Sequence, residues 1–364
     1  MKAERSKPAS HARENGGRPL NAEDARAAGL RYVTDDGPGI RRRRKGSGWT
    51  YRDPSGATIR ARAERQRIAA LAIPPAWTDV WICPDPRGHI HASGRDARGR
   101  KQYRYHALWR QVRDTAKFGR MIEFGVALPQ MRARVEELMR RRALSREMVL
   151  ATVVRLLETT FIRVGNEFYT RENGTFGLTT LRDRHVTISG SEIRFRFKGK
   201  TGRIVETSVK DRRLARIVRE CQEIPGYELF QYLDENNERC RVDSEDVNAF
   251  LREIAGDDFT AKDFRTWFGT LHAFTWLCAR GPGESEAETR RIAIEAIDYV
   301  AEQLRNTRAV SRASYVHPHV LHGHERGLLS EMFASGFDHA DPPEGLDAAE
   351  AALLALLKRV ERDA

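Results

Sequence analysis

Cysteines and long apolar runs are scarce in this sequence. Only four cysteines occur among the 364 residues, and no two form a C-x-x-C pair, which argues against a disulfide framework or a zinc finger. No apolar run approaches the roughly 20 residues that a membrane span needs, and the N-terminus lacks the apolar core of a secretory signal. Carboxylates do not cluster as metal ligands would, since Asp263 and Glu167 stand singly among basic residues. We therefore expect a soluble cytoplasmic protein without a bound metal.

Acidic residues are outnumbered by basic ones, 51 against 63, so the chain carries a formal net charge of +12. Most of the basic residues are arginines, whose forked guanidinium groups suit phosphate oxygens. A nucleic acid is therefore the expected partner, with an anionic membrane surface as the competing interpretation. The length predicts two domains and additional tails.

The first 46 residues are rich in Arg, Ala, Gly and Pro and hold few large apolar side chains. Such a segment cannot bury enough surface to offset its ordering entropy, so we predict a disordered basic tail over residues 1–46. Its run Arg41 to Lys45 is either solvated or a non-specific phosphate clamp, and the sequence does not decide between the two. Residues 47–118 contain short alternating runs separated by Pro, Asp and Gly, which predicts a small β-rich domain.

The last strand of that domain interleaves basic residues with aromatics and a glutamine. Alternation places Gln102 on one face and Tyr103 and Tyr105 on the other. Arg and Gln can bond base edges, while Lys and Tyr suit phosphates. Arg100 and Lys101 therefore join these three residues as candidate DNA contacts. The competing interpretation is a polar edge strand whose tyrosines fill a core.

Helical patterns dominate residues 119–330, where we predict a second domain. One helix is expected from Pro129 to Arg142, and a strongly apolar core helix from Ser145 to Val164. Two strands and a hairpin then form a small β-sheet excursion. Residues 331–364 read as an acidic tail with an amphipathic helix from Leu346 to Val360. The predicted fold is α+β, with a small β-rich N-terminal domain and a larger, mainly α-helical domain.

Several cations of the helical domain occupy positions where a fold can hold them rigidly. Arg163 ends the apolar core helix, and Lys262 and Arg265 share one helix face because they are three residues apart. Lys200 lies at the tip of the hairpin FRFKGKTGR. That hairpin is not a nucleotide-binding loop, because it lacks the upstream glycine and no helix follows. Lys200 is either an exposed hairpin lysine or one delivered into a groove.

Tyr315 lies among arginines in LRNTRAVSRASYVHPH, nine residues after Asn306. A tyrosine hydroxyl has an ordinary pKa of about 10, but among cations it can lose its proton and attack phosphorus. The alternative is a buried tyrosine on a basic helix. Four histidines crowd just beyond it, and we interpret them as part of a polar loop rather than a zinc site, since structural zinc normally pairs histidine with cysteine.

Four motifs together resemble the type IB DNA topoisomerases, in particular their compact poxvirus-like form found in bacteria. The resemblance covers roughly residues 49–325. The motifs occur in family order with family-like spacing: IRVGNEFYTRENGTFGLTTLRDRHV, FRFKGKTG, KDFRTWFGT and LRNTRAVSRASYVHP.

The resemblance implies roles for individual residues. Tyr315 matches the nucleophile, Arg163 and Arg265 match the two catalytic arginines, and Lys200 matches the general acid. Lys262 matches the lysine of the K-x-x-R element, and Asn306 lies where many members have histidine. The residues that match DNA contacts are Gln102, Tyr103, Tyr105 and Tyr169.

The resemblance also implies an activity. It is the relaxation of positive and negative supercoils through a 3′-phosphotyrosyl intermediate, without ATP, metal or another cofactor. The partner would be double-stranded DNA of the bacterial nucleoid, clamped by a monomer. A tyrosine recombinase is the alternative enzyme, but recombinases typically have histidine where this chain has Lys262, and a helical N-terminal domain. A DNA-binding protein without catalysis is the remaining alternative.

Overall fold

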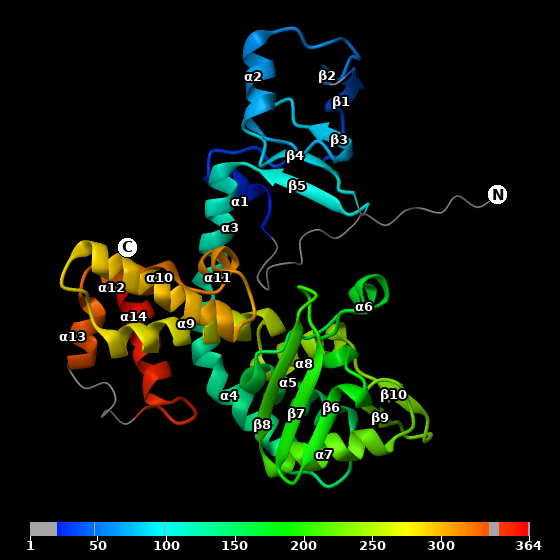
Figure 1. Ribbon diagram of the computed structural model, residues 1–364, viewed down its shortest axis with the longest axis vertical. Coiled ribbons are helices and arrows are strands. Elements are labelled where there is room, and N and C mark those ends of the chain that lie inside the picture. The colour runs from blue at the N-terminus through cyan, green and yellow to red at the C-terminus, as the bar shows by residue number, and fades with distance from the viewer. Residues whose placement is uncertain (1–19, 47, 98, 335–341, 363–364) are drawn as a thin grey trace. The chain divides into compact units, whose positions relative to one another are not determined.

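The computed structural model describes residues 20–46, 48–97, 99–334 and 342–362 (Figure 1). The described residues fall into two compact units, one ending at Lys117 and the other beginning at Phe118. Helix α3 (Ala107–Gly119) runs across that boundary. The predicted tail over residues 1–19 lies outside the described residues.

The first unit is built on one antiparallel five-stranded sheet with the strand order β2-β1-β3-β4-β5. Its core packs one helix against the sheet through Ile68, Val80, Ile82 and Ala92. The elements are α1 (Ala22–Ala27), β1 (Ile40–Lys45), β2 (Gly48–Arg52), α2 (Arg62–Ala70), β3 (Thr78–Ile82), β4 (Ile90–Arg95) and β5 (Lys101–Tyr105).

The prediction of disorder up to residue 46 is wrong for residues 20–46. Strand β1 carries the arginine run inside the sheet, with Ile40 only 3% exposed in the core. Arg42 donates to the carbonyls of Pro74 (3.1 Å) and Trp77 (2.5 Å) and lies 4.0 Å from the ring centroid of Trp49. Composition misleads here because two residues are enough to hold the strand: Ile40 in the core and Arg42 with its carbonyl partners. The other basic side chains of the strand remain in water.

The second unit is mainly helical and contains two small antiparallel sheets, β6-β7-β8 and β9-β10. Its helices are α4 (Met121–Met139), α5 (Arg146–Thr160), α6 (Glu167–Asn173), α7 (Arg212–Glu223), α8 (Ser244–Ala255), α9 (Ala261–Arg280), α10 (Glu286–Gln303), α11 (Arg308–Ser314), α12 (Pro318–Glu325), α13 (Leu328–Ala334) and α14 (Ala348–Arg362). Two short 3-10 helices and five strands complete it: η1 (Leu178–Thr180), η2 (Asp183–His185), β6 (Val186–Ser189), β7 (Glu192–Lys198), β8 (Ile204–Lys210), β9 (Gln231–Leu233) and β10 (Arg239–Arg241). This composition confirms the predicted α+β class.

Helices α5 and α9 form the centre of the second unit. Ten of the 15 residues of α5 are buried, which matches the apolar run that predicts it. It ends at Thr160 rather than at Val164, because Phe161 adopts a left-handed φ of 55°. Helix α9 carries Trp267, which is fully buried, and contacts α4, α5 and α10 (Figure 1). These two helices therefore supply a rigid base for the residues that follow or sit on them.

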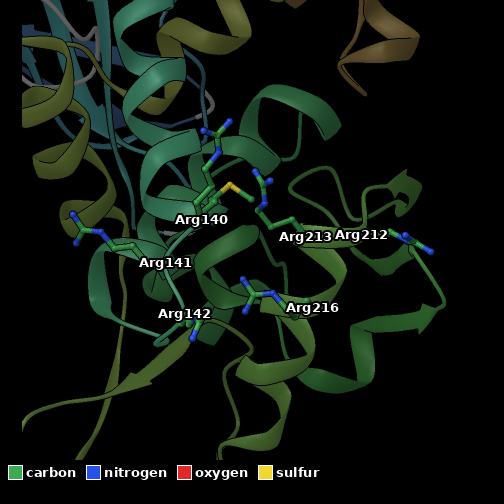
Figure 2. Close-up of a pocket in the computed structure, with 7 residues that line it drawn as sticks. Arg140, Arg141, Arg142, Arg212, Arg213 and Arg216 are labelled. Carbon is green, nitrogen blue, oxygen red and sulfur yellow. The ribbon is translucent and has the colours of Figure 1, made fainter.

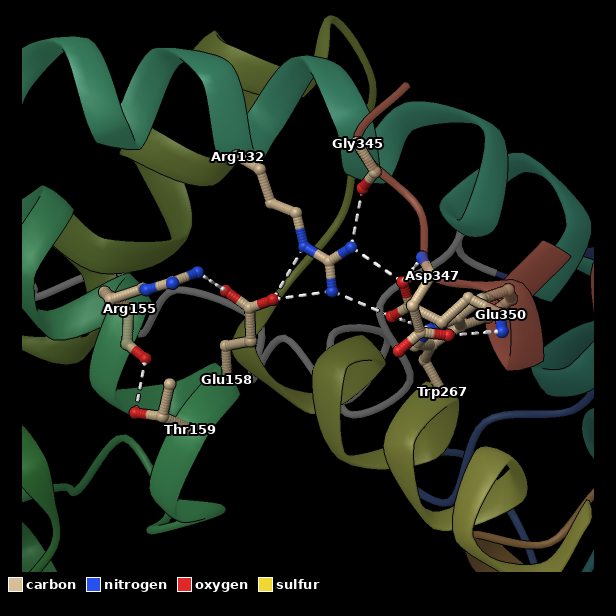
Figure 3. Close-up of polar contacts among 8 residues, drawn as sticks. All are labelled: Arg132, Arg155, Glu158, Thr159, Trp267, Gly345, Asp347 and Glu350. Carbon is tan, nitrogen blue, oxygen red and sulfur yellow. Dashed lines mark hydrogen bonds and ion pairs between the residues drawn. The ribbon is translucent and has the colours of Figure 1, made fainter. Parts of the chain in front are cut away.

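The C-terminal segment is not a separate tail. Helix α14 buries Leu353, Leu356 and Leu357 in the core of the second unit. Between α4 and α14, the Arg132 guanidinium donates to both carboxylate oxygens of Glu350 at 2.7 Å (Figure 3). The amphipathic helix predicted from Leu346 to Val360 is thus present as α14, and the inward-facing leucines make it part of the core.

Candidate active site

Tyr315 is the C-terminal cap of α11 and is 9% exposed. The Thr270 hydroxyl of α9 donates to the Tyr315 carbonyl at 3.1 Å, and the backbone N–H of His317 donates to the same hydroxyl at 3.1 Å. Gly269 allows this close approach, since a Cβ there would lie 2.7 Å from the Tyr315 carbonyl oxygen. The tyrosine backbone is thus fixed on α9 from two sides.

Arg265 lies on α9 with 4% exposure, and its guanidinium is 5.3 Å from the centroid of the Tyr315 ring. It donates to the carbonyl of Phe161 and, at 2.7 Å, to the carbonyl of Leu304. Both acceptors belong to chain turns with non-glycine residues at positive φ, Phe161 itself and Arg305 at 53°. Such conformations persist only where the surroundings impose them, so the turns that end α5 and α10 are shaped around this guanidinium.

Arg163 and Asn306 form a direct pair beside that cluster. The Arg163 guanidinium donates to Oδ1 of Asn306 at 2.5 Å. Since Oδ1 accepts from an arginine, the other amide atom, Nδ2, is a donor. It is buried and has no hydrogen-bond partner among the described residues. A buried donor without a partner costs free energy unless a ligand satisfies it, so the pair presents an unused donor to the site.

The cations around Tyr315 change its ionisation. Burial alone would raise the pKa of the hydroxyl, but the charges of Arg265 and Arg163, with a hydrogen bond from Arg265 and the charge of Lys262, hold the pKa below its ordinary value of 10.0. Burial and the neighbouring charge of Arg163 lower the pKa of Arg265 to about 10. The site therefore favours negative charge at its centre.

The two lysines expected at the site occupy different places. Lys262 lies in the first turn of α9, one turn before Arg265. Lys200 lies on the exposed turn between β7 and β8, and its ammonium is 5.6 Å from the ring centroid of Tyr169 on α6. The structure thus brings Lys262 to the Arg265 helix face and places Lys200 over an aromatic ring.

The residues predicted to contact DNA in the first unit have partners within that unit. Gln102 and Arg100 both bond Asp96, at 3.1 and 2.8 Å. Tyr103 and Tyr105 stack with ring centroids 5.7 Å apart, as the alternation predicts for one face.

Lys101 donates to Asp35 at 2.9 Å. Tyr105 also packs in a small cluster with Leu30 and Trp109, so part of this face is core. β5 is an edge strand of the sheet.

Sequence reasoning missed three residues that shape the site. Thr270 and Gly269 hold the Tyr315 backbone, and Arg305 donates to the Thr160 carbonyl at 3.3 Å. Burial and the charge of Arg163 lower the pKa of Arg305. Gly269 and Thr270 lie in the motif KDFRTWFGT, so that motif could have indicated that they belong to the site. Nothing in the sequence marks Arg305 as different from the other arginines.

The histidines beyond Tyr315 lie mainly on a helix, so the predicted loop there is wrong. His317 caps α12 by accepting from the backbone N–H of His319 at 3.1 Å. In the described part of the chain, no group of three or more His, Cys, Asp or Glu side chains could hold a metal ion. Nor does any helix of these residues have the length and apolar character that crossing a membrane takes.

Comparisons with known proteins agree with this geometry. Residues 106–326 match the family described as eukaryotic DNA topoisomerase I, catalytic core, and residues 48–96 match the bacterial DNA topoisomerase IB N-terminal domain. The DNA topoisomerase 1B of Acanthamoeba polyphaga mimivirus is 34% identical over 259 residues, which span 69% of this chain and 77% of the relative. The DNA topoisomerase 1B of vaccinia virus (strain Copenhagen) is 32% identical over 108 residues, 29% of this chain and 34% of the relative.

These matches do not favour the recombinase alternative, because both families and both relatives are topoisomerases. The first match also covers every residue of the cluster around Tyr315. By its sequence, the chain belongs to the type IB DNA topoisomerase family.

Proposed function

We propose that this protein relaxes supercoiled double-stranded DNA through a transient covalent bond to Tyr315. The observation that carries the proposal is the position of Arg265, held by two carbonyls and 5.3 Å from the Tyr315 ring. The Tyr315 oxygen attacks a backbone phosphorus, the bond from phosphorus to the 5′-oxygen breaks, and a 3′-phosphotyrosine remains. The tyrosine proton leaves to solvent, and the departing 5′-oxygen gains a proton.

Charge develops on the non-bridging phosphate oxygens during this step, so fixed donors are the main catalytic device. Arg163, Arg265 and Nδ2 of Asn306 supply such donors. Nδ2 of Asn306 and Nε of Arg265 are buried without a hydrogen-bond partner among the described residues, which supports this role. Arginine keeps its charge at neutral pH, so these contacts do not depend on protonation there.

Lys200 is the proposed general acid for the 5′-oxygen, and Lys262 a further cation near the phosphate. The position of Lys200 on an exposed turn supports delivery of a proton to bound DNA, because such a lysine can leave Tyr169 at little cost. Religation reverses these steps. The phosphotyrosine retains the energy of the phosphodiester, so neither ATP nor a metal is required.

The proposed DNA contacts outside the cleavage centre include side chains that suit phosphates and side chains that can bond base edges. They are Arg100, Lys101, Gln102, Tyr103, Tyr105 and Tyr169. We infer that one chain clamps one duplex in the bacterial nucleoid. The net charge of +12 supports phosphate-dominated binding whose affinity falls steeply with salt.

The test is relaxation of positively and negatively supercoiled plasmid in EDTA without ATP, with products trapped by detergent. The full chain should relax both, with protein attached to a 3′ DNA end. Tyr315→Phe should bind DNA nearly normally and form no adduct, whereas Tyr227→Phe, on a tyrosine that is 76% exposed, should relax DNA normally. Relaxation by Tyr315→Phe would remove this residue from the mechanism. Strand exchange without relaxation, or binding without any adduct, would overturn the proposed activity.

A further inference from the structure

A pocket lined by six arginines lies between the C-terminal end of α4 and the start of α7 (Figure 2). Its volume is about 580 Å³, within the range of small-molecule sites. One methionine, Met139, is the remaining lining residue. The arginines are Arg140, Arg141, Arg142, Arg212, Arg213 and Arg216. Most ligand pockets are apolar with a few polar groups, so a lining that is almost wholly cationic points to an anion.

Nearby carboxylates offset only part of this charge. Glu136 binds Arg140 and Arg213, Glu137 binds Arg141 at 3.4 Å, and Glu220 binds Arg216 at 2.7 Å. Three carboxylates against six guanidinium groups leave three positive charges around one cavity. Like charges held this close repel each other, so the arrangement costs free energy until an anion enters.

Two of the six arginines are uncommitted. Arg142 and Arg212 are exposed, and neither has a hydrogen bond or ion pair with any residue that the structure describes. They come from different elements, the loop after α4 and the first turn of α7. Figure 2 shows Arg142 and Arg212 extending in different directions from the pocket. Because neither side chain has a partner in the described part of the chain, a bound anion can recruit both without breaking an existing contact.

Helix stability does not explain the arginines of α7. The N-terminal end of a helix carries partial positive charge, and acidic residues are favoured there. The first turn of α7 has no acidic residue and begins with Arg212 and Arg213. Their charges add to the helix dipole instead of opposing it. The N-cap residue, Asp211, already accepts from the backbone N–H groups of Arg213 and Leu214, so a bound anion would meet the arginine side chains rather than the helix end.

Two separate elements, α5 and β8, each hold the pocket residues at a distance from the residues of the cleavage centre. Helix α5 has 15 residues and lies between Arg142 and Arg163, a separation of about 22 Å at 1.5 Å per residue. Strand β8 has seven residues and lies between the Lys200 turn and Arg212, which is about 23 Å at 3.3 Å per residue. A phosphate group bound at Tyr315 therefore cannot also occupy the arginine pocket.

We infer that this pocket binds a free inorganic oligophosphate. Arg142 and Arg212 donate to its terminal phosphate groups, and Arg213 and Arg216 to groups further inside. No aromatic side chain lines the pocket, so a nucleobase would find no stacking partner there and recognition rests on phosphate alone. The pocket presents arginines from two elements, so a short chain of phosphates can contact both elements at once.

Calorimetric titration of the full chain with sodium tripolyphosphate tests this inference. The DNA cleft is first saturated with a short duplex, at low and at moderate salt. One tripolyphosphate per chain should bind, with ATP binding no more tightly than tripolyphosphate. Arg142→Gln/Arg212→Gln should weaken binding at least tenfold while thermal unfolding and plasmid relaxation stay as in the wild type. Lys358→Gln/Arg359→Gln, which removes two exposed charges from α14, should bind as the wild type does.

Three results would overturn the inference. Equal weakening in both double variants would show that only net charge matters. Complete loss of tripolyphosphate binding when the duplex saturates the cleft would place the anion at the cleavage centre. A second duplex per chain that is lost in Arg142→Gln/Arg212→Gln, without tripolyphosphate binding, would identify nucleic acid as the occupant. Absence of relaxation activity in the wild type would count against the proposed function and leave this binding test unaffected.

Discussion

Arg132 on α4 and Glu350 on α14 form a two-pronged ion pair, with both nitrogen–oxygen distances at 2.7 Å and Glu350 only 1% exposed (Figure 3). Arg132 also bonds Glu158 on α5, so one guanidinium joins three helices. The Trp267 indole of α9 donates to Glu350 at 3.4 Å, two residues beyond Arg265. The C-terminal helix is thereby bonded through Glu350 to Trp267 on α9, which carries Arg265, and through Arg132 to Glu158 on α5, which precedes Arg163.

Glu350→Ala should lower the free energy of unfolding by about 2–3 kcal/mol. Breaking a buried ion pair often costs about 3–5 kcal/mol because a lone charge is left behind. Here Glu158 still accompanies Arg132, so the cost should be smaller. Urea unfolding followed by far-UV circular dichroism measures it. Glu361→Ala, on the exposed face of the same helix, should change stability by less than about 0.5 kcal/mol. Similar losses in the two variants would mean that the pair contributes nothing specific.

Gly269→Ala should slow DNA cleavage by about a hundredfold. In an ordinary helix this change stabilises by up to about 1 kcal/mol. At this position the new Cβ would lie 2.7 Å from the Tyr315 carbonyl oxygen and 3.0 Å from its Cβ, so the tyrosine must shift. A displacement of about 1 Å in a reacting group can cost about a hundredfold in rate. Single-turnover cleavage of a short duplex gives the rate constant.

The matched control for that variant is Gly323→Ala on α12. Its new Cβ would meet only the Leu329 side chain, at 3.4 Å. It should cleave at the wild-type rate. If Gly269→Ala did the same, the close approach of α9 to Tyr315 would have no part in positioning the nucleophile.

The residues that the structure gathers around one point were accessible from the sequence as motifs. Periodicity placed Arg265 on an aromatic-rich helix and Arg163 at the end of an apolar one, although α5 ends at Thr160 and Arg163 follows it. Family motifs placed both residues at the site. Lys200 was placed correctly on a hairpin turn. Its contact with Tyr169 was not predictable, since it joins segments that no local pattern relates.

Elements that depend on a distant partner were misjudged. Pro129 was expected to begin a helix, yet α4 starts at Met121 and continues through it. Proline normally interrupts a helix, but here Gly345 lies against the Pro129 ring and Arg132 bonds the Gly345 carbonyl. Likewise, the arginine strand β1 depends on carbonyls of Pro74 and Trp77, in the loop between α2 and β3, that accept from Arg42. A reading of local composition cannot supply such partners.

Asn306→Asp should reduce cleavage by about a hundredfold or more. Aspartate can still accept from Arg163, as Oδ1 does now at 2.5 Å, but it has no donor in place of Nδ2 and it repels a phosphate. Removal of one preorganised donor typically costs about a hundred- to a thousandfold. Asn306→Ala should lose a similar amount, and DNA binding should change far less than cleavage in both. Normal cleavage by Asn306→Asp would show that Asn306 only positions Arg163.

The lowered pKa of Tyr315 predicts a particular pH dependence of cleavage. Burial raises the pKa of this hydroxyl, while Arg265, Arg163 and Lys262 lower it further than burial raises it. The phenolate attacks, so the single-turnover rate should rise with pH, with a midpoint below pH 10, the ordinary pKa of tyrosine. Arg163→Ala removes one of the lowering charges and leaves burial in place. The midpoint of the pH–rate curve of this variant should therefore lie at higher pH than in the wild type. Its maximal cleavage rate should also be lower.

Cleavage of a short duplex between pH 6 and 10.5 measures both midpoints. Arg290→Ala, which removes an exposed charge from α10, should leave the midpoint unchanged. A slower Arg163→Ala enzyme with the wild-type midpoint would assign the pH dependence to another group. The arginine would then act on the phosphate alone and not on the ionisation of the tyrosine.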